Sequence, residues 1–362
     1  MLKYKIRPLH NSPHMATRMT RRDILYAIPG AFGLGALLRA QQLIVGGESA
    51  TGAFSTIAMN HVTLAVTNAK RSQEFYQRLF GLPIVATQGP VPIMRLGSGP
   101  QFIALSERPT GKPGIDHVCL TIERFEVERV MKTLAGFGVT AAEPGFAGGL
   151  AGGPLRARVR MRGPEAGGAK EGTPEIYFAD PDGITLQLQA PTYCGGAGLV
   201  GEVCSSPAPA GKPPLVTREM NHVTLAVSDS KRSLDFYQRV FGLPVVANQG
   251  PIPIMRVGRG PTFIALSPAG QANPRIDHVC VTIENFDPDR TMQTLADLGV
   301  KKAEGTAGGP LTARIRMRGP ENGGAKEGTP ELYFTDPDGI TIQLQDVRYC
   351  GGAGRVGEVC KA

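Results

Sequence analysis

The sequence lacks any long hydrophobic run, and beyond its first forty residues it lacks an excess of positive charge. Of the formal net charge of +8, residues 1–40 carry +6, from seven Lys and Arg residues against one Asp. The rest of the chain is close to neutral, which argues against a nucleic-acid partner. The apolar run at residues 26–38 is too short and too rich in Gly to cross a bilayer, so we expect no stable membrane span. A chain of 362 residues can build two domains with cores of their own.

The basic N-terminal region is typical of a targeting segment. Residues 20–25 read Thr-Arg-Arg-Asp-Ile-Leu, a twin-arginine pattern, and the short apolar run that follows leads to a small residue, Ala40. We predict a twin-arginine-like signal over residues 1–40, a linker over residues 41–57, and a periplasmic or otherwise exported protein. An ordinary basic amphipathic helix is the alternative.

Cysteine is sparse, but its placement is regular. Four of the six cysteines flank two nearly identical Gly-rich loops: Cys194, Cys204, Cys350 and Cys360. We favour a disulfide within each loop, which suits an oxidising destination, with free thiols or a Cys-bound metal as alternatives. Cys119 and Cys280 stand inside apparent strands, where we expect them to be buried and reduced.

The chain after the signal is one unit written twice. Residues 59–66 return letter for letter at residues 220–227, and later segments return 161 or 156 residues further on. The change of offset places five extra residues in the first repeat, near residues 146–151. We predict two domains joined by a linker rich in Ser, Pro, Ala and Gly: residues 58–204, 219–362 and, between them, 205–218.

Each repeat contains two smaller modules of the order β-α-β-β-β. In the first module a strand at residues 61–66 precedes a helix at about residues 69–80, which has an apolar stripe and stops at Gly81. In the second, a strand at residues 117–122 precedes a helix at about residues 127–137. Helices on one side of a mainly antiparallel sheet make the class α+β, with four modules paired into two curled-sheet domains.

Each repeat closes on the turn Asp-Pro-Asp-Gly, followed by a strictly alternating strand. Proline presets the turn, and glycine accepts the positive φ that follows. After the first turn, Leu186 and Leu188 point one way and Gln187 the other. Parity likewise places His61 and His117 opposite the apolar faces of their strands. We therefore expect two imidazoles and one amide oxygen on the side of each sheet away from the helices.

All four histidines after the signal occupy these positions, 56 residues apart in each repeat. A single histidine on a strand is more often structural, but four histidines at equivalent positions favour metal ligation. Imidazole together with an oxygen donor suits Fe(II), Mn(II), Zn or Ni, with coordination positions left open for a substrate.

With its paired modules, its first-strand His in Asn-His-Val and Asp-His-Val, and its closing Asp-Pro-Asp-Gly strand, the chain resembles the vicinal oxygen chelate superfamily. That superfamily contains glyoxalase I, type I extradiol dioxygenases, fosfomycin-resistance proteins and bleomycin-binding proteins. The resemblance covers about residues 58–195 and 219–350. It implies up to one divalent metal per repeat, inside the curled sheet, with these ligands: His61, His117 and Gln187, then His222, His278 and Gln343.

The spacing Tyr-x2-Asp-Pro-x-Gly-x3 before the third ligand looks most like the extradiol dioxygenases, in which the tyrosine helps to bind and polarise the substrate. That resemblance makes Tyr177 and Tyr333 candidate catalytic residues. Two departures count against ring cleavage. The third ligand is Gln and not Glu, and the histidine that dioxygenases carry shortly before the tyrosine is missing, with Lys170 and Lys326 nearby. Gln is a known ligand type in glyoxalase I, so metal binding survives the change better than oxygen chemistry does.

Arginines alternate along one further strand of each repeat. Two interpretations stay open: a solvated outer face with salt bridges, or an anion-binding wall for a carboxylate or phenolate substrate. The residues concerned are Arg156, Arg158, Arg160 and Arg162, and in the second repeat Arg314, Arg316 and Arg318.

Together these features predict an exported, duplicated, metal-dependent enzyme that chelates two neighbouring oxygens of a small, anionic or aromatic substrate. Its reaction would be that of a dioxygenase or of a lyase or isomerase. The rival is a non-catalytic protein that holds a small molecule in the same cleft without metal, as the bleomycin-binding relatives do. Retention of both histidines in both repeats argues against the rival, and the absence of a carboxylate ligand argues for it.

Overall fold

Strands outnumber helices in the structure, which is a computed structural model and describes residues 52–143, 149–303 and 309–362. The predicted signal and part of the insertion near residues 146–151 lie outside the described residues. In the part of the chain that is described, no helix combines the length and the apolar character that a membrane crossing requires.

The first repeat contains two modules of the predicted type, with one short additional strand, β6. Its elements in chain order are β1 (Thr56–Val66), α2 (Ala69–Phe80), β2 (Ile84–Gln88), β3 (Val91–Arg95), β4 (Phe102–Glu107), β5 (Gly114–Ile122), α3 (Val127–Ala135), β6 (Thr140–Ala141), β7 (Arg156–Arg162), β8 (Thr173–Ala179) and β9 (Thr185–Gln189).

The second repeat follows the same order. Its elements are β10 (Thr217–Val227), α4 (Ser230–Phe241), β11 (Val245–Gln249), β12 (Ile252–Arg256), β13 (Phe263–Pro268), β14 (Arg275–Ile283), α5 (Pro288–Asp297), β15 (Lys301–Lys302), β16 (Thr312–Arg318), β17 (Thr329–Thr335) and β18 (Thr341–Asp346). The predicted α+β class, with curled sheets built from repeated modules, is confirmed.

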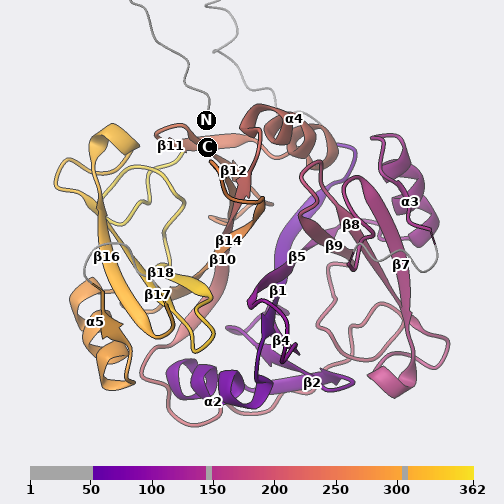
Figure 1. Cartoon of the computed structure of the whole chain (residues 1–362), viewed down its shortest axis with the longest axis horizontal. Coiled ribbons are helices and arrows are strands. Elements are labelled where there is room, and N and C mark those ends of the chain that lie inside the picture. The colour runs from indigo at the N-terminus through magenta and orange to yellow at the C-terminus, as the bar shows by residue number, and fades with distance from the viewer. Residues whose placement is uncertain (1–51, 144–148, 304–308) are drawn as a thin grey trace, which may run out of the picture. The chain divides into compact units, whose positions relative to one another are not determined.

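The two modules of each repeat join through their first strands. β1 pairs antiparallel with β5 and parallel with β4, and β5 pairs parallel with β9. The first repeat therefore has the strand order β2-β3-β4-β1-β5-β9-β8-β7-β6. The second repeat has the equivalent order, and the two sheets touch where Ile115 on β5 faces Ile276 on β14. Figure 1 shows these first strands running through the middle of the view.

Helix α2 begins and ends as its sequence predicts. Asn68 precedes α2, and its side chain accepts a hydrogen bond from the amide of Arg71, which satisfies one of the free N–H groups of the first turn. Gly81 ends the helix with φ of 66°, a left-handed conformation that glycine adopts without strain. The predicted helix at residues 69–80 matches α2, whereas the second helix ends at Ala135 and not near residue 137.

The closing turn of each repeat also binds a helix of the other repeat, which the sequence did not reveal. In the first repeat, one carboxylate oxygen of Asp180 accepts from the amides of Asp182 and Ile184, and the other accepts from the hydroxyl of Tyr237 on α4 at 3.0 Å. Asp182 forms an ion pair with Arg232 at the start of the same helix at 2.6 Å. The turn thus fixes β9 and α4 together.

The arrangement is reciprocal. Tyr76 on α2 donates to Asp336 at 2.9 Å, and Arg71 pairs with Asp338 at 2.6 Å. The aromatic stripe of α2 packs on the same module, with Phe75 and Phe334 6.2 Å apart between ring centroids. Figure 1 shows α2 beside the yellow strands of the second repeat. One buried apolar cluster therefore runs through both repeats.

Part of the segment predicted as a linker before the first domain is built into the fold. Phe54 is buried and stacks on Phe241 of α4, and its amide donates to the carbonyl of Val240. The segment just before β1 therefore adds a further contact between the first repeat and a helix of the second.

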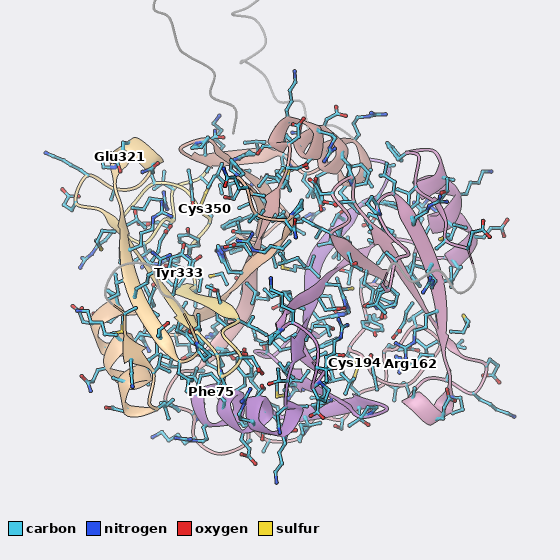
Figure 2. All side chains as sticks on the ribbon, in the orientation of Figure 1. Phe75, Arg162, Cys194, Glu321, Tyr333 and Cys350 are labelled. Atoms are coloured by element: carbon cyan, nitrogen blue, oxygen red, sulfur yellow. A yellow bond between two sulfur atoms is a disulfide. The ribbon has the colours of Figure 1, made fainter. Side chains whose placement is uncertain are left out.

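Both predicted disulfides are present, Cys194–Cys204 and Cys350–Cys360, while Cys119 and Cys280 are free and buried as expected. The first loop is also held from inside by Arg162, whose Nη2 donates to the carbonyl of Gly196 at 2.9 Å. Figure 2 labels Arg162 and Cys194, which lie close together in the view.

The closing turns predict a pH signature. Burial raises the pKa of Asp180 to about 6. The folded state therefore binds this proton more readily than the unfolded chain, and the resulting stabilisation is present below about pH 4 and lost as the pH rises through about 6. Asp180→Asn removes that loss. As the pH rises from about 4 to about 6, wild type should lose this stabilisation and the variant should not. The free energy of unfolding of the variant, relative to that of wild type, should therefore increase by about 1–3 kcal/mol over this range.

Asp182→Asn is the control of opposite sign. Burial opposes ionisation of Asp182, but the hydrogen bonds from Ser228 and Arg232 outweigh it and lower its pKa. Its stabilisation is present at neutral pH and lost as the pH falls, so this variant should be most destabilised above about pH 5. Urea unfolding of both variants and wild type across pH 4 to 7 measures how the free energy of unfolding of each protein depends on pH. Parallel curves for all three proteins would contradict the assignment.

Candidate metal centre

In each repeat one row of side chains crosses six strands on the same face of the sheet. Each residue of the row pairs with the next one on the neighbouring strand, so all the side chains point to one side of the sheet. The row in the first repeat is Phe102, His61, Cys119, Gln187, Tyr177 and Arg158. The row in the second is Phe263, His222, Cys280, Gln343, Tyr333 and Arg314.

His61 is held in one orientation by its neighbours. Asn60 donates from Nδ2 to the backbone carbonyl of Tyr193 at 2.8 Å, which turns its Oδ1 towards the ring. His61 Nδ1 donates to that oxygen at 2.8 Å, and the ring stacks on Phe102 with 4.1 Å between centroids. Burial, and then the nearby His117, lower the pKa of His61 well below its ordinary value. The ring is therefore neutral, with its lone pair on Nε2.

His117 is oriented in the same way by a carboxylate. Its Nδ1 donates to Asp116 at 2.8 Å, and the hydroxyl of Thr63 lies 3.2 Å from its Nε2. Burial disfavours a charged Asp116, but the hydrogen bond from His117 and the charge of Arg108 lower its pKa overall. A carboxylate behind an imidazole fixes the tautomer and strengthens the ring as a metal ligand.

Two β-bulges bring these supporting residues into place. In the pairing of β1 with β5, Asn60 and Asp116 are each an extra residue without a partner on the opposite strand. Strict alternation would point them away from the histidines that follow them. A bulge re-aims a side chain, so each one lies beside the next residue's ring. The same irregularities recur at Asn221 and Asp277.

The three predicted ligands of each repeat converge. Gln187 Oε1 lies 3.1 Å from Nε2 of His61 and 3.1 Å from Nε2 of His117, and Gln343 has the same two distances to His222 and His278. Both Nδ1 atoms bond elsewhere, so each ring turns its Nε2 towards the same amide oxygen, and the lone pair of the neutral His61 faces an oxygen that also carries lone pairs. We call each set a His-His-Gln triad.

This arrangement fits a divalent metal. Lone pairs that face one another repel, and a cation bound by all three removes the repulsion. Two donors bound at right angles, about 2.1–2.2 Å from a metal, are about 3.0 Å apart, close to the observed separation. The donor set, two imidazoles and an amide oxygen, suits the metals predicted above. Within the described residues no three His, Cys, Asp or Glu side chains form a metal-binding group, which is consistent with an amide as third ligand.

A buried network of charge lies next to the triad. Glu175 is fully buried and accepts from Arg162 Nε at 2.7 Å, from the Tyr193 hydroxyl at 3.0 Å and from the Tyr177 hydroxyl at 3.2 Å. Burial, and then Glu175, raise the pKa of Tyr177 well above its ordinary value, so it stays a neutral phenol. Its ring meets His117 edge-on at 5.2 Å. To donate a hydrogen bond to a ligand, the Tyr177 hydroxyl would have to break its hydrogen bond to Glu175 or share its proton between the two acceptors.

The triad of the second repeat lies on the wall of a cavity of about 200 Å³. Two of the alternating arginines, Arg314 and Arg316, line it together with Tyr333. The third, Arg318, is buried and bonded to Glu331 at 2.7 Å. The interpretation as a solvated outer face is therefore wrong for the buried Arg162 and Arg318, whereas Arg314 and Arg316 lie where the anion-binding interpretation needs them.

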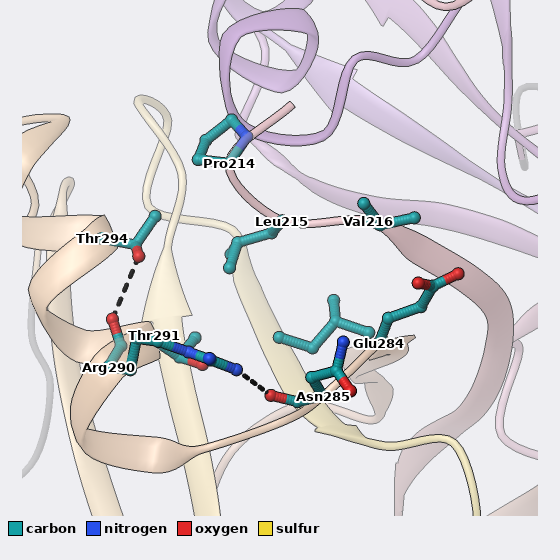
Figure 3. A pocket seen from close by; sticks show the side chains of 9 residues that line it. Pro214, Leu215, Val216, Glu284, Asn285, Arg290, Thr291 and Thr294 are labelled. Carbon is teal, nitrogen blue, oxygen red and sulfur yellow. Dashed lines mark hydrogen bonds between the residues drawn. The ribbon is translucent and has the colours of Figure 1, made fainter. Parts of the chain in front are cut away.

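A second hollow, of about 260 Å³, lies between residues 214–216 and helix α5 (Figure 3). Its polar groups are already engaged. Arg290 donates to the carbonyl of Asn285, Thr294 donates to the carbonyl of Arg290, and Glu284 pairs with Arg218 at 2.9 Å. We assign no function to it.

The sequence pattern found the triad residues and missed their supports. Asn60 and Asp116 precede the histidines directly, but strand parity hides them because it assumes no bulge. Glu175 ends the segment Gly-Gly-Ala-Lys-Glu-Gly-Thr-Pro-Glu, which recurs unchanged in the second repeat. That identity was a usable signal for a buried structural carboxylate.

Two curled sheets, each with oriented imidazoles and an oxygen donor on its inner face, define a protein of the vicinal-oxygen-chelate type. A model of the Glyoxalase/Bleomycin resistance protein/Dioxygenase superfamily matches residues 58–188 and 219–344. The chain belongs to this superfamily, and the two matches agree with the repeat.

Individual proteins that are similar to this chain have several different activities. The metallothiol transferase FosB of Staphylococcus saprophyticus is 26% identical over 132 residues, which are 35% of this chain and 76% of that protein. A Mn(II)-bound glyoxalase from Novosphingobium aromaticivorans superposes with a TM-score of 0.54 at 15% identity, covering 80% of this chain and 82% of that one. Homoprotocatechuate 2,3-dioxygenase from Brevibacterium fuscum, in complex with 3,4-dihydroxyphenylacetate, gives 0.56 at 18% identity, covering 82% of each chain. Both structures have the same fold as this chain.

Exchanging the amide for a carboxylate tests the triad. Gln187→Glu keeps the shape of the side chain and adds a negative charge beside the two imidazoles. In a His278→Ala background, which leaves the first repeat as the intact triad, we expect the dissociation constant for Mn(II) or Zn(II) to fall about tenfold or more. Competition with a fluorescent chelator measures it. Gln187→Leu, which removes the donor, should weaken binding, and equal affinities for all three proteins would contradict the triad as a metal site.

Proposed function

We propose that the protein is an exported, metal-dependent enzyme that holds one divalent metal in each repeat and acts on a small substrate through two neighbouring oxygens. The convergence of the His-His-Gln triad carries this proposal. The amide oxygen of Gln187 lies 3.1 Å from Nε2 of each imidazole, and each imidazole is fixed from behind by Asn60 or Asp116. Such pre-orientation is what a catalytic metal site requires of its surroundings.

A bound divalent metal supplies Lewis acidity towards an oxygen of the substrate. The chain's own residues define the surroundings of that oxygen. Phe102 covers one face of His61 and keeps water from it. Thr63 offers a hydroxyl beside His117. Tyr177 stays protonated, so it can donate a hydrogen bond to a developing negative charge if it leaves Glu175.

Among reaction classes we place redox-neutral chemistry first, that of a lyase, an isomerase or a group transferase. The neutral Gln187 supports it, because an uncharged ligand leaves the metal more Lewis acidic and holds Fe(II) less strongly than a carboxylate does. The sequence similarity to FosB supports it as well. Extradiol cleavage is the second candidate, favoured by the position of Tyr177 in the row beside Gln187.

Export is supported by two independent features. The twin-arginine pattern stands at residues 20–25, and each repeat closes one disulfide, which persists best outside a reducing compartment. The twin-arginine route carries folded proteins, which suits a protein that takes up its metal before it leaves the cytoplasm.

The rival function is sequestration of a small molecule without metal. An amide in place of a carboxylate favours it. Both histidines in both repeats argue against it, because a binding pocket has no need of two buried imidazoles fixed by Asn60 and Asp116.

Two isomeric probes distinguish these functions. Catechol has neighbouring hydroxyl oxygens, whereas resorcinol has the same composition with the oxygens one carbon further apart. Calorimetric titration of protein loaded with Mn(II) or Zn(II) should show catechol binding about tenfold or more tighter than resorcinol. The His117→Ala/His278→Ala double variant should lose catechol binding. If that variant binds catechol as wild type does, the protein is a metal-independent binder.

A further inference from the structure

The row of the second repeat ends in an arginine that faces the triad cavity. Arg314 lies opposite Tyr333, and Tyr333 lies opposite Gln343 in the pairing registers. The guanidinium stacks over the Tyr333 ring at 5.3 Å from its centroid. Arg314 therefore lines the same cavity as the triad, with one tyrosine ring between them.

The carboxylates near this arginine are already engaged. Glu331 bonds Arg318 at 2.7 Å and accepts from the hydroxyls of Tyr333 and Tyr349, and Arg316 reaches it only at 3.8 Å. In the described part of the chain no ion pair joins Arg314 to a carboxylate, and its Nε is buried without a hydrogen-bond partner. The guanidinium thus keeps donors free on the cavity wall.

The triad adds no negative charge to this cavity, because its members are two imidazoles and an amide. Asp277, the remaining carboxylate in the lining, is paired with Arg275 and with His278 at 3.1 Å. A divalent metal beside Arg314 and Arg316 would leave several positive charges uncompensated in a half-buried space, which costs free energy. A ligand that carries negative charge offsets that cost.

The first repeat differs at the equivalent place. Arg158 donates to the carbonyl of Gly149, in the region of the five-residue insertion. Ala151 is buried and packs against Tyr177, which is 3% exposed, compared with 8% for Tyr333. The insertion therefore engages the first repeat's arginine, and the second repeat, which is shorter here, leaves its arginine facing the cavity.

Building on the proposed function, we propose that the second repeat binds a substrate that carries a carboxylate in addition to its two neighbouring oxygens, and that Arg314 binds that carboxylate. A guanidinium offers two parallel N–H groups, which match the two oxygens of a carboxylate. A cavity of about 200 Å³ accommodates a small acid of this type. The two repeats then differ in substrate preference, because the first repeat's Arg158 is held by Gly149.

The test compares catechol with 3,4-dihydroxybenzoate, which adds a carboxylate to the same vicinal diol. In a His117→Ala background, which leaves the second repeat as the intact triad, the metal-loaded protein should bind 3,4-dihydroxybenzoate more tightly than catechol. Arg314→Gln should raise the dissociation constant for 3,4-dihydroxybenzoate by about 10-fold to 100-fold and change that for catechol by less than a factor of about three. Arg314→Lys, which keeps the charge but not the paired donors, should fall between. Calorimetry gives the dissociation constants.

Arg158→Gln in the same background is the matched control and should change neither constant. Equal effects of Arg314→Gln on both probes, or no effect on either, would overturn the carboxylate assignment while leaving vicinal-oxygen binding intact. If neither probe binds the metal-loaded protein, the proposed function fails and this inference fails with it. Circular dichroism and the melting temperature of each variant report whether the fold is retained.

Discussion

The antiparallel pairing of β1 with β5 is the contact on which the rest of the site depends. Its register sets His61 opposite Cys119 and His117 opposite Thr63, and β9 then adds Gln187 beside Cys119. A slip of one residue would turn the histidines into the apolar core. The two bulges preserve the alternation of the histidines while bringing their supporting side chains to the same face. The register of the sheet therefore fixes the geometry of the triad.

A second constraint links the repeats. The closing turn that begins β9, and so places Gln187, is fixed by Tyr237 and Arg232 of helix α4 in the other repeat. The reciprocal contacts come from Tyr76 and Arg71. The glutamine of each triad is thus positioned by a helix of the neighbouring repeat. The two Tyr–Asp contacts are buried and the two Arg–Asp pairs are partly exposed, and all four join one repeat to the other. One apolar cluster accompanies them across both repeats.

The periodicity of the sequence was enough to predict helix α2, the module order and the triad, since a regular strand or helix obeys a fixed repeat. It could not predict what depends on tertiary pairing. An apolar stripe on α2 does not say which sheet it covers, so its contact with Phe334 was missed. Strand parity does not reveal bulges, so Asn60 and Asp116 were missed. Alternation of Arg156 to Arg162 did not separate the buried Arg162 from the exposed Arg156 and Arg160.

The central claim is that each His-His-Gln triad binds a metal, and elemental analysis tests it most directly. The protein should be purified without chelators or a metal-binding tag, alongside the His117→Ala/His278→Ala variant. The account predicts about two equivalents of Fe, Mn, Zn or Ni per chain in wild type and none in the variant. A wild-type protein without metal that takes up none on titration would contradict it. The amides of Gln187 and Gln343 would then be turned to donate to the imidazoles, and the triads would be structural.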